Sequence, residues 1–191
     1  MAWDKNGNLY LSTGDGTAPF PAEGYAPLDE RPGPEHYSLD SQRGAGNTND
    51  YKGKILRIHP EKDGTYTIPA GNLFPPGTDS TKPEIYIMGV RNPYRIAVNP
   101  VTSVLYWGDI GPDAGADSQR GPKGYDEFNQ ARKAGNFCWP YFVANNQAYA
   151  RWDFEKKRAG PRFDTAHPVN NSPKNTGLKN LPPPMPAMIW Y

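Results

Sequence analysis

Hydrophobic residues in this chain fall into short runs in which apolar and polar positions alternate. Leu9 and Leu11, for example, are separated by Tyr10 and followed by Ser12. A period of two residues is typical of a β-strand that buries one face. The same pattern predicts strands within residues 8–16, 51–58, 65–68, 85–90, 95–100 and 103–111.

Turn-forming residues separate the predicted strands. Asn6-Gly7 and Asp63-Gly64 favour tight two-residue hairpins, because these residues tolerate positive φ. Residues 17–50 are interpreted as a long loop or insertion, and residues 145–180 as a polar, Pro-rich loop region. Residues 125–142 are compatible with a short helix, by propensity, or with a strand, by context.

The segment 83–112 combines three of the predicted strands with chemically active turns. Arg91-Asn92-Pro93 lies between the first two strands, and Gly111-Pro112 follows the third. Binding and catalytic residues are often placed on turns that a rigid scaffold holds in position. We therefore expect this segment to carry the functional residues.

Composition supports an all-β fold with long loops. The chain has 191 residues, of which 20 are Gly, 22 are Pro and only 36% are hydrophobic. Disordered chains share these features, but they are poor in aromatic residues, which make up 13% here. Many turns together with many aromatic side chains favour a folded all-β domain.

Charge and hydropathy exclude several kinds of partner. The net charge is +1, and no basic run is interleaved with aromatic residues, so we expect no nucleic acid partner. No run approaches the roughly 18 apolar residues of a membrane span.

The two ends of the chain carry their own signals. The residues that follow Met1 do not have the pattern of a signal peptide, so we expect either a cytosolic protein or a missing N-terminus. The apolar end, residues 181–191, favours a sequence that continues.

The residues that commonly bind metals offer little in this sequence. Cys138 is the only cysteine, which excludes an internal disulfide and favours a small buried apolar residue. His36, His59 and His167 lack metal-ligand spacing, and we interpret all three as surface residues. Residues 170–172 form a short N-glycosylation sequon, a weak motif by itself.

A weak internal repeat points to a β-propeller. Residues 7–16 and 103–111 both contain Leu-Tyr, then Gly-Asp, then Gly. Recurring units of this kind are typical of propeller blades.

The order of motifs between residues 4 and 144 resembles the glucose/sorbosone dehydrogenase family. The motifs are NGNLYLSTGDG, YKGKILRI, DGTYTIPAGNLF, PEIYIMGVRNPYRIAV, GDIGPDA, DEFN and GNFCWP. Members of that family are six-bladed β-propeller enzymes that use pyrroloquinoline quinone (PQQ) and calcium. The resemblance implies that residues 1–191 form one incomplete propeller domain of about two to three blades.

The resemblance also implies roles for individual residues. Arg91 and Asn92 match the pair that contacts the cofactor, and the main-chain carbonyls of Gly111 and Pro112 match calcium ligands. Glu127 matches a residue that serves a second, structural calcium. From spacing alone, each has a plainer interpretation: a surface ion pair for Arg91, a simple turn for Gly111-Pro112, and a solvated loop residue for Glu127.

In the family, a histidine just before the position of Met1 is the general base, so none of the histidines in this chain is expected to be catalytic. The resemblance implies hydride transfer from an aldose sugar to PQQ, with an electron acceptor such as a cytochrome. It also implies a periplasmic or secreted full-length protein. We expect the 191-residue chain alone to be inactive.

Two other functions remain open on the sequence. One is a non-catalytic propeller that binds a sugar or a protein. The other is a calcium-dependent lactonase-like propeller, which needs metal-binding Glu, Asn and Asp side chains that converge near the axis.

Overall fold

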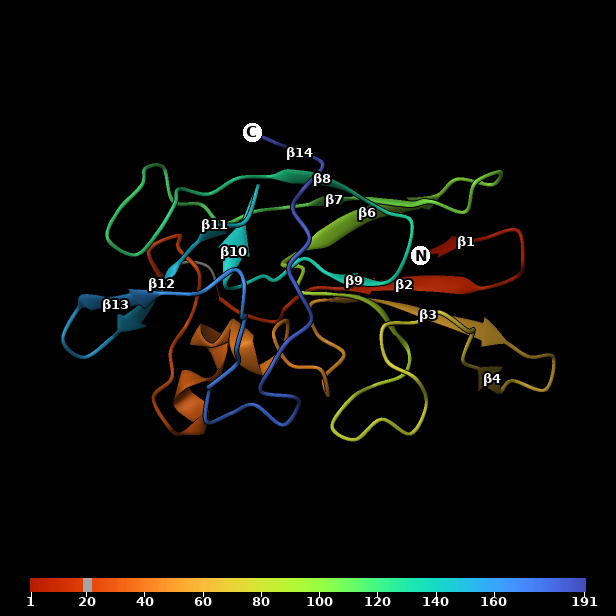
Figure 1. The fold of residues 1–191 in the computed structure, drawn as a ribbon, viewed down its shortest axis with the longest axis horizontal. Helices are drawn as coiled ribbons and strands as arrows, with labels where there is room; N and C mark the ends of the chain where they lie inside the picture. Colours follow the sequence, from red (N-terminus) through yellow and green to blue (C-terminus); the bar gives the residue numbers. More distant parts are fainter. Residues whose placement is uncertain (19–21) are drawn as a thin grey trace.

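The computed structural model describes residues 1–18 and 22–191, which form β-strands, loops and two short 3-10 helices (Figure 1). The prediction of an all-β chain is confirmed. The longer strands are β2 (Leu9–Thr13), β3 (Lys54–Pro60), β5 (Ile85–Met88), β6 (Pro93–Val98), β7 (Leu105–Asp109), β8 (Glu127–Ala131), β12 (Ala150–Asp153) and β13 (Arg158–Arg162). Two-residue strands are β1 (Ala2–Trp3), β4 (Tyr66–Thr67), β9 (Gly135–Asn136), β10 (Phe142–Val143), β11 (Gln147–Ala148) and β14 (Ile189–Trp190). The 3-10 helices are η2 (Pro34–Leu39) and η3 (Ser41–Arg43).

The first large sheet has the strand order β1-β2-β3-β5-β9, with β4 paired to the far end of β3. Its neighbours are antiparallel except β5 and β9, where Ile87 pairs with Gly135 in parallel. Parallel neighbours need a long crossover. Here the crossover contains β6, β7 and β8, which belong to the second large sheet.

The second large sheet has the order β14-β8-β7-β6 and is entirely antiparallel. Figure 1 shows it above the first sheet, with the C-terminal strand β14 at its outer edge. Neither sheet closes on itself, and two small hairpins, β10-β11 and β12-β13, lie beside them.

An apolar cluster joins the two large sheets. Tyr10 and Ile55 come from the first sheet and Trp107 from the second, and all three are buried. Trp107 packs edge-on against Phe137, with 4.7 Å between the ring centroids. Burying each such side chain contributes about 1.5–3 kcal/mol, so this cluster fixes how the two sheets meet.

The ambiguous and loop regions contain regular structure. Residues 125–142 form strands β8, β9 and the start of β10, so context prevails over helix propensity. Residues 17–50 include both 3-10 helices, although positions 19–21 of that predicted loop lie outside the described residues. Residues 145–180 include β11, β12 and β13, which were not predicted. These strands are short and lack a clean alternation of buried and exposed side chains.

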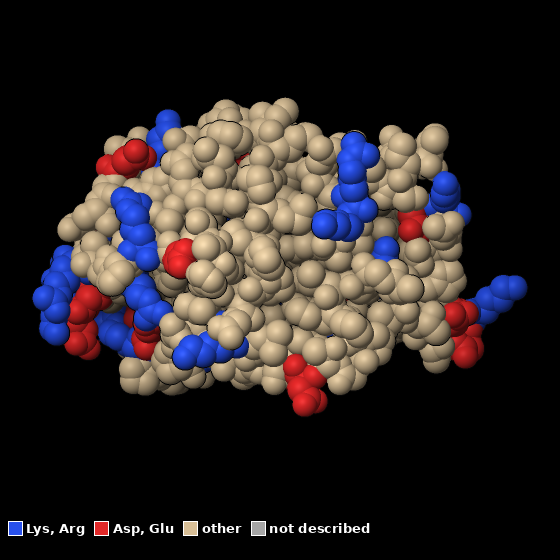
Figure 2. Space-filling model, viewed as in Figure 1, with Lys and Arg blue, Asp and Glu red and all other residues tan. Residues whose placement is uncertain are grey.

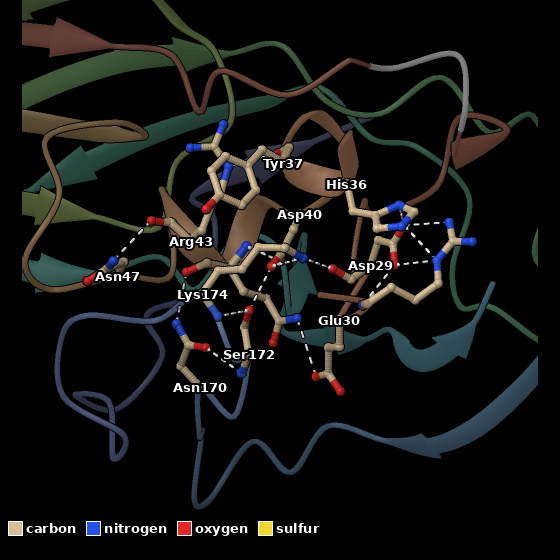
Figure 3. Close-up of polar contacts among 12 residues, drawn as sticks. Asp29, Glu30, His36, Tyr37, Asp40, Arg43, Asn47, Asn170, Ser172 and Lys174 are labelled. Atoms are coloured by element: carbon tan, nitrogen blue, oxygen red, sulfur yellow. Dashed lines mark hydrogen bonds and ion pairs between the residues drawn. The ribbon is translucent and has the colours of Figure 1, made fainter. Parts of the chain in front are cut away.

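A polar network connects the two loop regions (Figure 3). Asp40 is completely buried and accepts hydrogen bonds from Ser172 Oγ (2.6 Å) and Lys174 Nζ (3.3 Å). Lys174 Nζ also donates to the carbonyl of Asp29 (2.6 Å). Burial raises the pKa of Asp40, and the hydrogen bonds to Ser172 and Lys174 oppose that rise. Residues 170–175 thus hold the 29–47 region in place.

The sequon at residues 170–172 belongs to this network and is not available for a glycan. Asn170 is only 2% exposed, and its amide donates to the carbonyls of Gln42 (2.8 Å) and Gly46 (2.9 Å). A glycan on Asn170 would require this part of the fold to open.

Replacing Asn170 with alanine should lower the free energy of unfolding by about 2 kcal/mol, because two buried carbonyls lose their donor. Urea unfolding followed by tryptophan fluorescence measures the change. The matched control is Asn171→Ala, since Asn171 is exposed in the same segment and should change stability by less than about 0.5 kcal/mol. Equal effects of the two substitutions would contradict the role of the network.

Basic and acidic side chains are mixed on the face shown in Figure 2, where they lie mainly towards the edges. No extended basic surface is visible on that face, as expected for a net charge of +1. Among the described residues, no helix is long and apolar enough to span a membrane.

Candidate functional site

The turn formed by Arg91 and Asn92 connects β5 to β6 and is capped by a carboxylate. Asp109 lies at the end of β7, opposite Pro93 in the sheet. It accepts hydrogen bonds from the backbone N–H groups of Arg91 (3.1 Å) and Asn92 (2.6 Å). One side chain therefore satisfies both donors of the turn and fixes its conformation.

Asp109 sits in an apolar and acidic environment. Its burial, and next the charge of nearby Glu127, raise the pKa of Asp109 to about 8. The two backbone N–H donors favour the charged form and oppose this rise. Glu127 is also affected: burial raises its pKa, whereas hydrogen bonds from Asn129 and Ala144 lower it.

The side chain of Arg91 lies across the next turn. Its Nη1 donates to the carbonyls of Ile110 (2.9 Å) and Gly111 (2.5 Å). Its Nη2 is 3.8 Å from the exposed carboxylate of Asp113, and its guanidinium lies 6.0 Å from the ring centroid of Trp139. The structure thus brings Arg91 and Gly111 together, and it places the guanidinium on the carbonyl that was predicted to bind calcium.

The Gly111-Pro112 turn is tightly packed against the segment that follows it. A Cβ on Gly111 would lie 1.8 Å from the carbonyl oxygen of Tyr125, so only glycine fits there. The Gly111 N–H donates to Asp126 Oδ1 (2.7 Å). The carbonyl oxygen of Pro112 lies 1.5 Å from where a Cβ on Gly124 would stand. This close packing explains why Gly111 and Gly124 are both glycines, which have no side chain.

Glu127 lies in strand β8, not in a loop, and its carboxylate has partners. Oε1 accepts from the N–H of Ala144 (2.7 Å) and Oε2 from Nδ2 of Asn129 (3.0 Å). The alternative of a solvated loop residue is therefore wrong. In this structure Glu127 ties β8 to the start of the β10-β11 hairpin.

Asp15 is part of the site but was not identified from the sequence. It follows β2, is buried, and its N–H donates to the carbonyl of Arg91 (2.9 Å). Its carboxylate accepts hydrogen bonds from Trp139 Nε1 (2.7 Å) and from the hydroxyl of Ser41. The signal was the repeated Gly-Asp pair, because Asp15 and Asp109 occupy corresponding positions in the two copies and both contact the Arg91 turn.

These residues border a pocket. Its lining combines the guanidinium of Arg91 and the carboxylates of Asp109 and Glu127 with aromatic rings, and it includes Gly89, Gly111, Pro112, Tyr125, Phe137, Trp139, Phe142 and Val143. A neighbouring hollow is lined by residues 14–17 with Arg91 and Asn92. The arrangement offers fixed cationic donors to an anion or quinone oxygen, and carbonyl oxygens to a cation. Within residues 1–18 and 22–191, no three His, Cys, Asp or Glu side chains form a metal-binding group.

The three histidines lie outside this pocket. His36 approaches Asp29 (3.3 Å) and His59 bonds to Asn8 (3.0 Å); both are partly exposed, so the interpretation of these two as surface residues holds only in part. His167 is exposed and contacts Asp164 (3.2 Å), as predicted for a surface residue.

Cys138 is buried in the core, which confirms the prediction of a small buried apolar residue. Its burial also raises the pKa of the thiol. Its φ of 61° lies in the left-handed region, where glycine is favoured. The backbone keeps this conformation although a side chain is present. The N–H of Cys138 donates to Asn136 Oδ1 (2.9 Å), which stabilises the turn.

Curated relatives of this chain include two sugar dehydrogenases. It is 27% identical to quinoprotein glucose dehydrogenase B of Acinetobacter calcoaceticus over 165 residues, which cover 81% of this chain and 30% of the relative. It is 29% identical to an aldose sugar dehydrogenase of Escherichia coli (strain K12) over 96 residues, 50% of this chain and 22% of the relative. The matched regions thus span less than a third of each of these proteins.

The fold and the sequence profile agree with these relatives. A crystal structure of glucose dehydrogenase matches this chain over its whole length, with a TM-score of 0.50 at 18% identity. The match covers 38% of the glucose dehydrogenase chain. That likeness concerns the fold alone, and it confirms the prediction of a partial β-propeller. The profile of the family described as Glucose / Sorbosone dehydrogenase matches residues 1–178. The chain therefore belongs to the glucose/sorbosone dehydrogenase family.

Proposed function

We propose that this chain provides part of the cofactor pocket of a PQQ- and calcium-dependent enzyme that oxidises aldose sugars. The observation that carries the proposal is the convergence of Arg91 and Gly111 at one pocket, from turns that follow different strands, with Asn92 next to Arg91 in the neighbouring hollow. The relative in Acinetobacter calcoaceticus is by name a quinoprotein glucose dehydrogenase, which supports the same chemistry. The sugar, an electron acceptor such as a cytochrome, and a periplasmic or secreted location are parts of this proposal.

Arg91 and Asn92 are assigned to the cofactor. The backbone of both residues is fixed by Asp109, so their side chains start from a rigid turn. Guanidinium donors bind carboxylates and quinone oxygens strongly, and the amide of Asn92 adds a neutral donor. When bound, PQQ would accept the two electrons lost by a sugar hydroxyl, and calcium would polarise it.

The Gly111 carbonyl is suited to a cation, since it already accepts from a guanidinium. Calcium binding there, shared with the Pro112 carbonyl, would require Arg91 to move off Gly111 and would free its guanidinium for the cofactor. Glu127 remains our assignment for a second calcium. Its two oxygens each hold one donor, which leaves a lone pair on each.

No general base is assigned within this chain, because His36, His59 and His167 contact Asp29, Asn8 and Asp164 instead of the pocket. We therefore expect the 191-residue chain to bind PQQ without reducing a dye in the presence of sugar. Dye reduction that depends on PQQ would contradict this.

The proposal predicts that Arg91→Ala weakens PQQ binding about 10- to 100-fold in the presence of calcium, the loss expected for a charged hydrogen bond. Calorimetric titration of the folded chain measures it. Arg95→Ala is the matched control, since Arg95 is exposed on β6 and stacks only on Tyr94. Equal affinities of the two variants would contradict the assignment. Calcium binding without any PQQ binding would favour the lactonase-like alternative, and binding of neither would favour the non-catalytic module.

A further inference from the structure

Lys54 begins the central strand β3, and its environment is unusual for a charged residue. It pairs with Thr13 of β2 on one side and Met88 of β5 on the other, and its side chain is 0% exposed. Lysine is almost never fully buried unless it is paired. Yet no carboxylate among the described residues lies within ion-pair distance of its ammonium group.

Three backbone carbonyls replace the missing ion pair. The Nζ of Lys54 donates to the carbonyls of Gly44 (2.8 Å), Ala45 (3.1 Å) and Lys52 (2.8 Å). An ammonium group has three N–H donors and no acceptor, so the three carbonyls match the charged form. Burial lowers the pKa of Lys54 to about 7, and the charges of Asp50 and Asp15 oppose this shift. A ring of main-chain oxygens around a cation resembles a site for a metal ion.

The three carbonyls that surround the Nζ of Lys54 adjoin Asp15. Gly44 lies so close that its Cβ, if present, would be 3.0 Å from the carbonyl oxygen of Asp15. The N–H of Gly44 donates to the carbonyl of Ser41 (3.2 Å), and the hydroxyl of Ser41 donates to the carboxylate of Asp15. A short chain of contacts therefore runs from Lys54 to Asp15.

Asp15 in turn shapes the pocket. Its carboxylate holds the indole of Trp139, whose ring lies below the guanidinium of Arg91, and its N–H holds the Arg91 carbonyl. Among the residues that the structure describes, the buried carboxylate has only neutral donors in direct contact, from Thr17, Ser41 and Trp139. A positive charge nearby would stabilise it without competing for those donors.

We propose that Lys54 is a positioning residue for this pocket: its ammonium group is a built-in cation that holds residues 41–52 against Asp15 and so fixes Asp15 and Trp139 beside Arg91. The positioning role of Lys54 is expected to tighten cofactor binding, and only this consequence rests on the proposed function. The geometry of Asp15 and Trp139 can be measured without any cofactor, so failure of one proposal is distinguishable from failure of the other.

The test follows the indole N–H of Trp139 by ¹H–¹⁵N NMR of the full chain. The chain has five tryptophans, and Trp139→Phe identifies the signal. Lys54→Met keeps the bulk of the side chain but removes the donors, and we expect the Trp139 signal to shift by more than its line width. Lys52→Met, at an exposed neighbouring lysine, should leave it in place. An unchanged Trp139 signal in Lys54→Met would overturn the proposal.

Because Lys54→Met could also fail to fold, a second variant is tested with an amine that is added to the solution to supply the positive charge. Lys54→Ala leaves space for a small amine, and we expect propylammonium chloride to restore the wild-type Trp139 signal, whereas sodium chloride of equal ionic strength does not. Restoration only by the amine supports an ammonium group as the active element. No restoration, or equal restoration by sodium chloride, would overturn the proposal.

Discussion

Replacing Gly111 with alanine is expected to lower the free energy of unfolding by about 3 kcal/mol and to abolish PQQ binding. The added Cβ would stand 1.8 Å from the carbonyl oxygen of Tyr125, which is main chain and cannot rotate away. Overpacking of this kind costs about 1–3 kcal/mol, and a backbone clash lies at the upper end. Relief requires the turn to shift, and the shift would move the Gly111 carbonyl away from Arg91 and the calcium position.

Gly115 provides the matched control for this substitution. It lies four residues further along, and nothing lies within 4 Å of its added Cβ. Gly115→Ala should therefore change stability by less than about 0.5 kcal/mol and leave PQQ affinity unchanged. Urea unfolding and calorimetric titration of both variants give the comparison. A Gly111→Ala protein as stable as Gly115→Ala would show that the turn tolerates a side chain.

Replacing Asp109 with alanine should destabilise the chain by about 3 kcal/mol and weaken PQQ binding at least as much as the loss of Arg91 itself. The substitution leaves the partly buried N–H groups of Arg91 and Asn92 without their acceptor. A fully buried donor would cost about 1–3 kcal/mol, so the two together are expected to cost about 3 kcal/mol. It also releases the turn that presents both side chains. Asp109→Asn should lose less, because one amide oxygen can still accept from one of the two donors.

Asp113→Ala is the control for a nearby carboxylate without a capping role. Asp113 is 64% exposed and lies 3.8 Å from Arg91, so its removal should change stability by less than about 1 kcal/mol. Urea unfolding and PQQ titration distinguish the variants. If Asp109→Ala and Asp113→Ala behaved alike, the turn would not depend on its cap.

Local pattern accounts for the parts of the fold that were predicted. The six predicted strands contain β2, β4, β5 and β7 and most of β3 and β6, because period-two alternation and Gly-containing turns act over a few residues. Strands β11, β12 and β13 were missed, since pairing in a hairpin stabilises them despite a weak pattern. The choice of strand over helix for residues 125–142 depends on β7 and β5, which supply the partners of β8 and β9.

In the functional site, too, some features follow from the local sequence and others depend on the tertiary structure. The sequence by itself determined the all-β class, the turns that carry Arg91, Asn92, Gly111 and Pro112, and, through ordered motifs, the family. Only the tertiary structure showed that Arg91 rests on Gly111 and that Asp109 caps the turn. Only the tertiary structure also placed Trp139 on Asp15, a contact between residues 124 positions apart. The physical reason is that turn chemistry and alternation are local, whereas burial of a carboxylate or an ammonium group depends on distant segments that supply its partners.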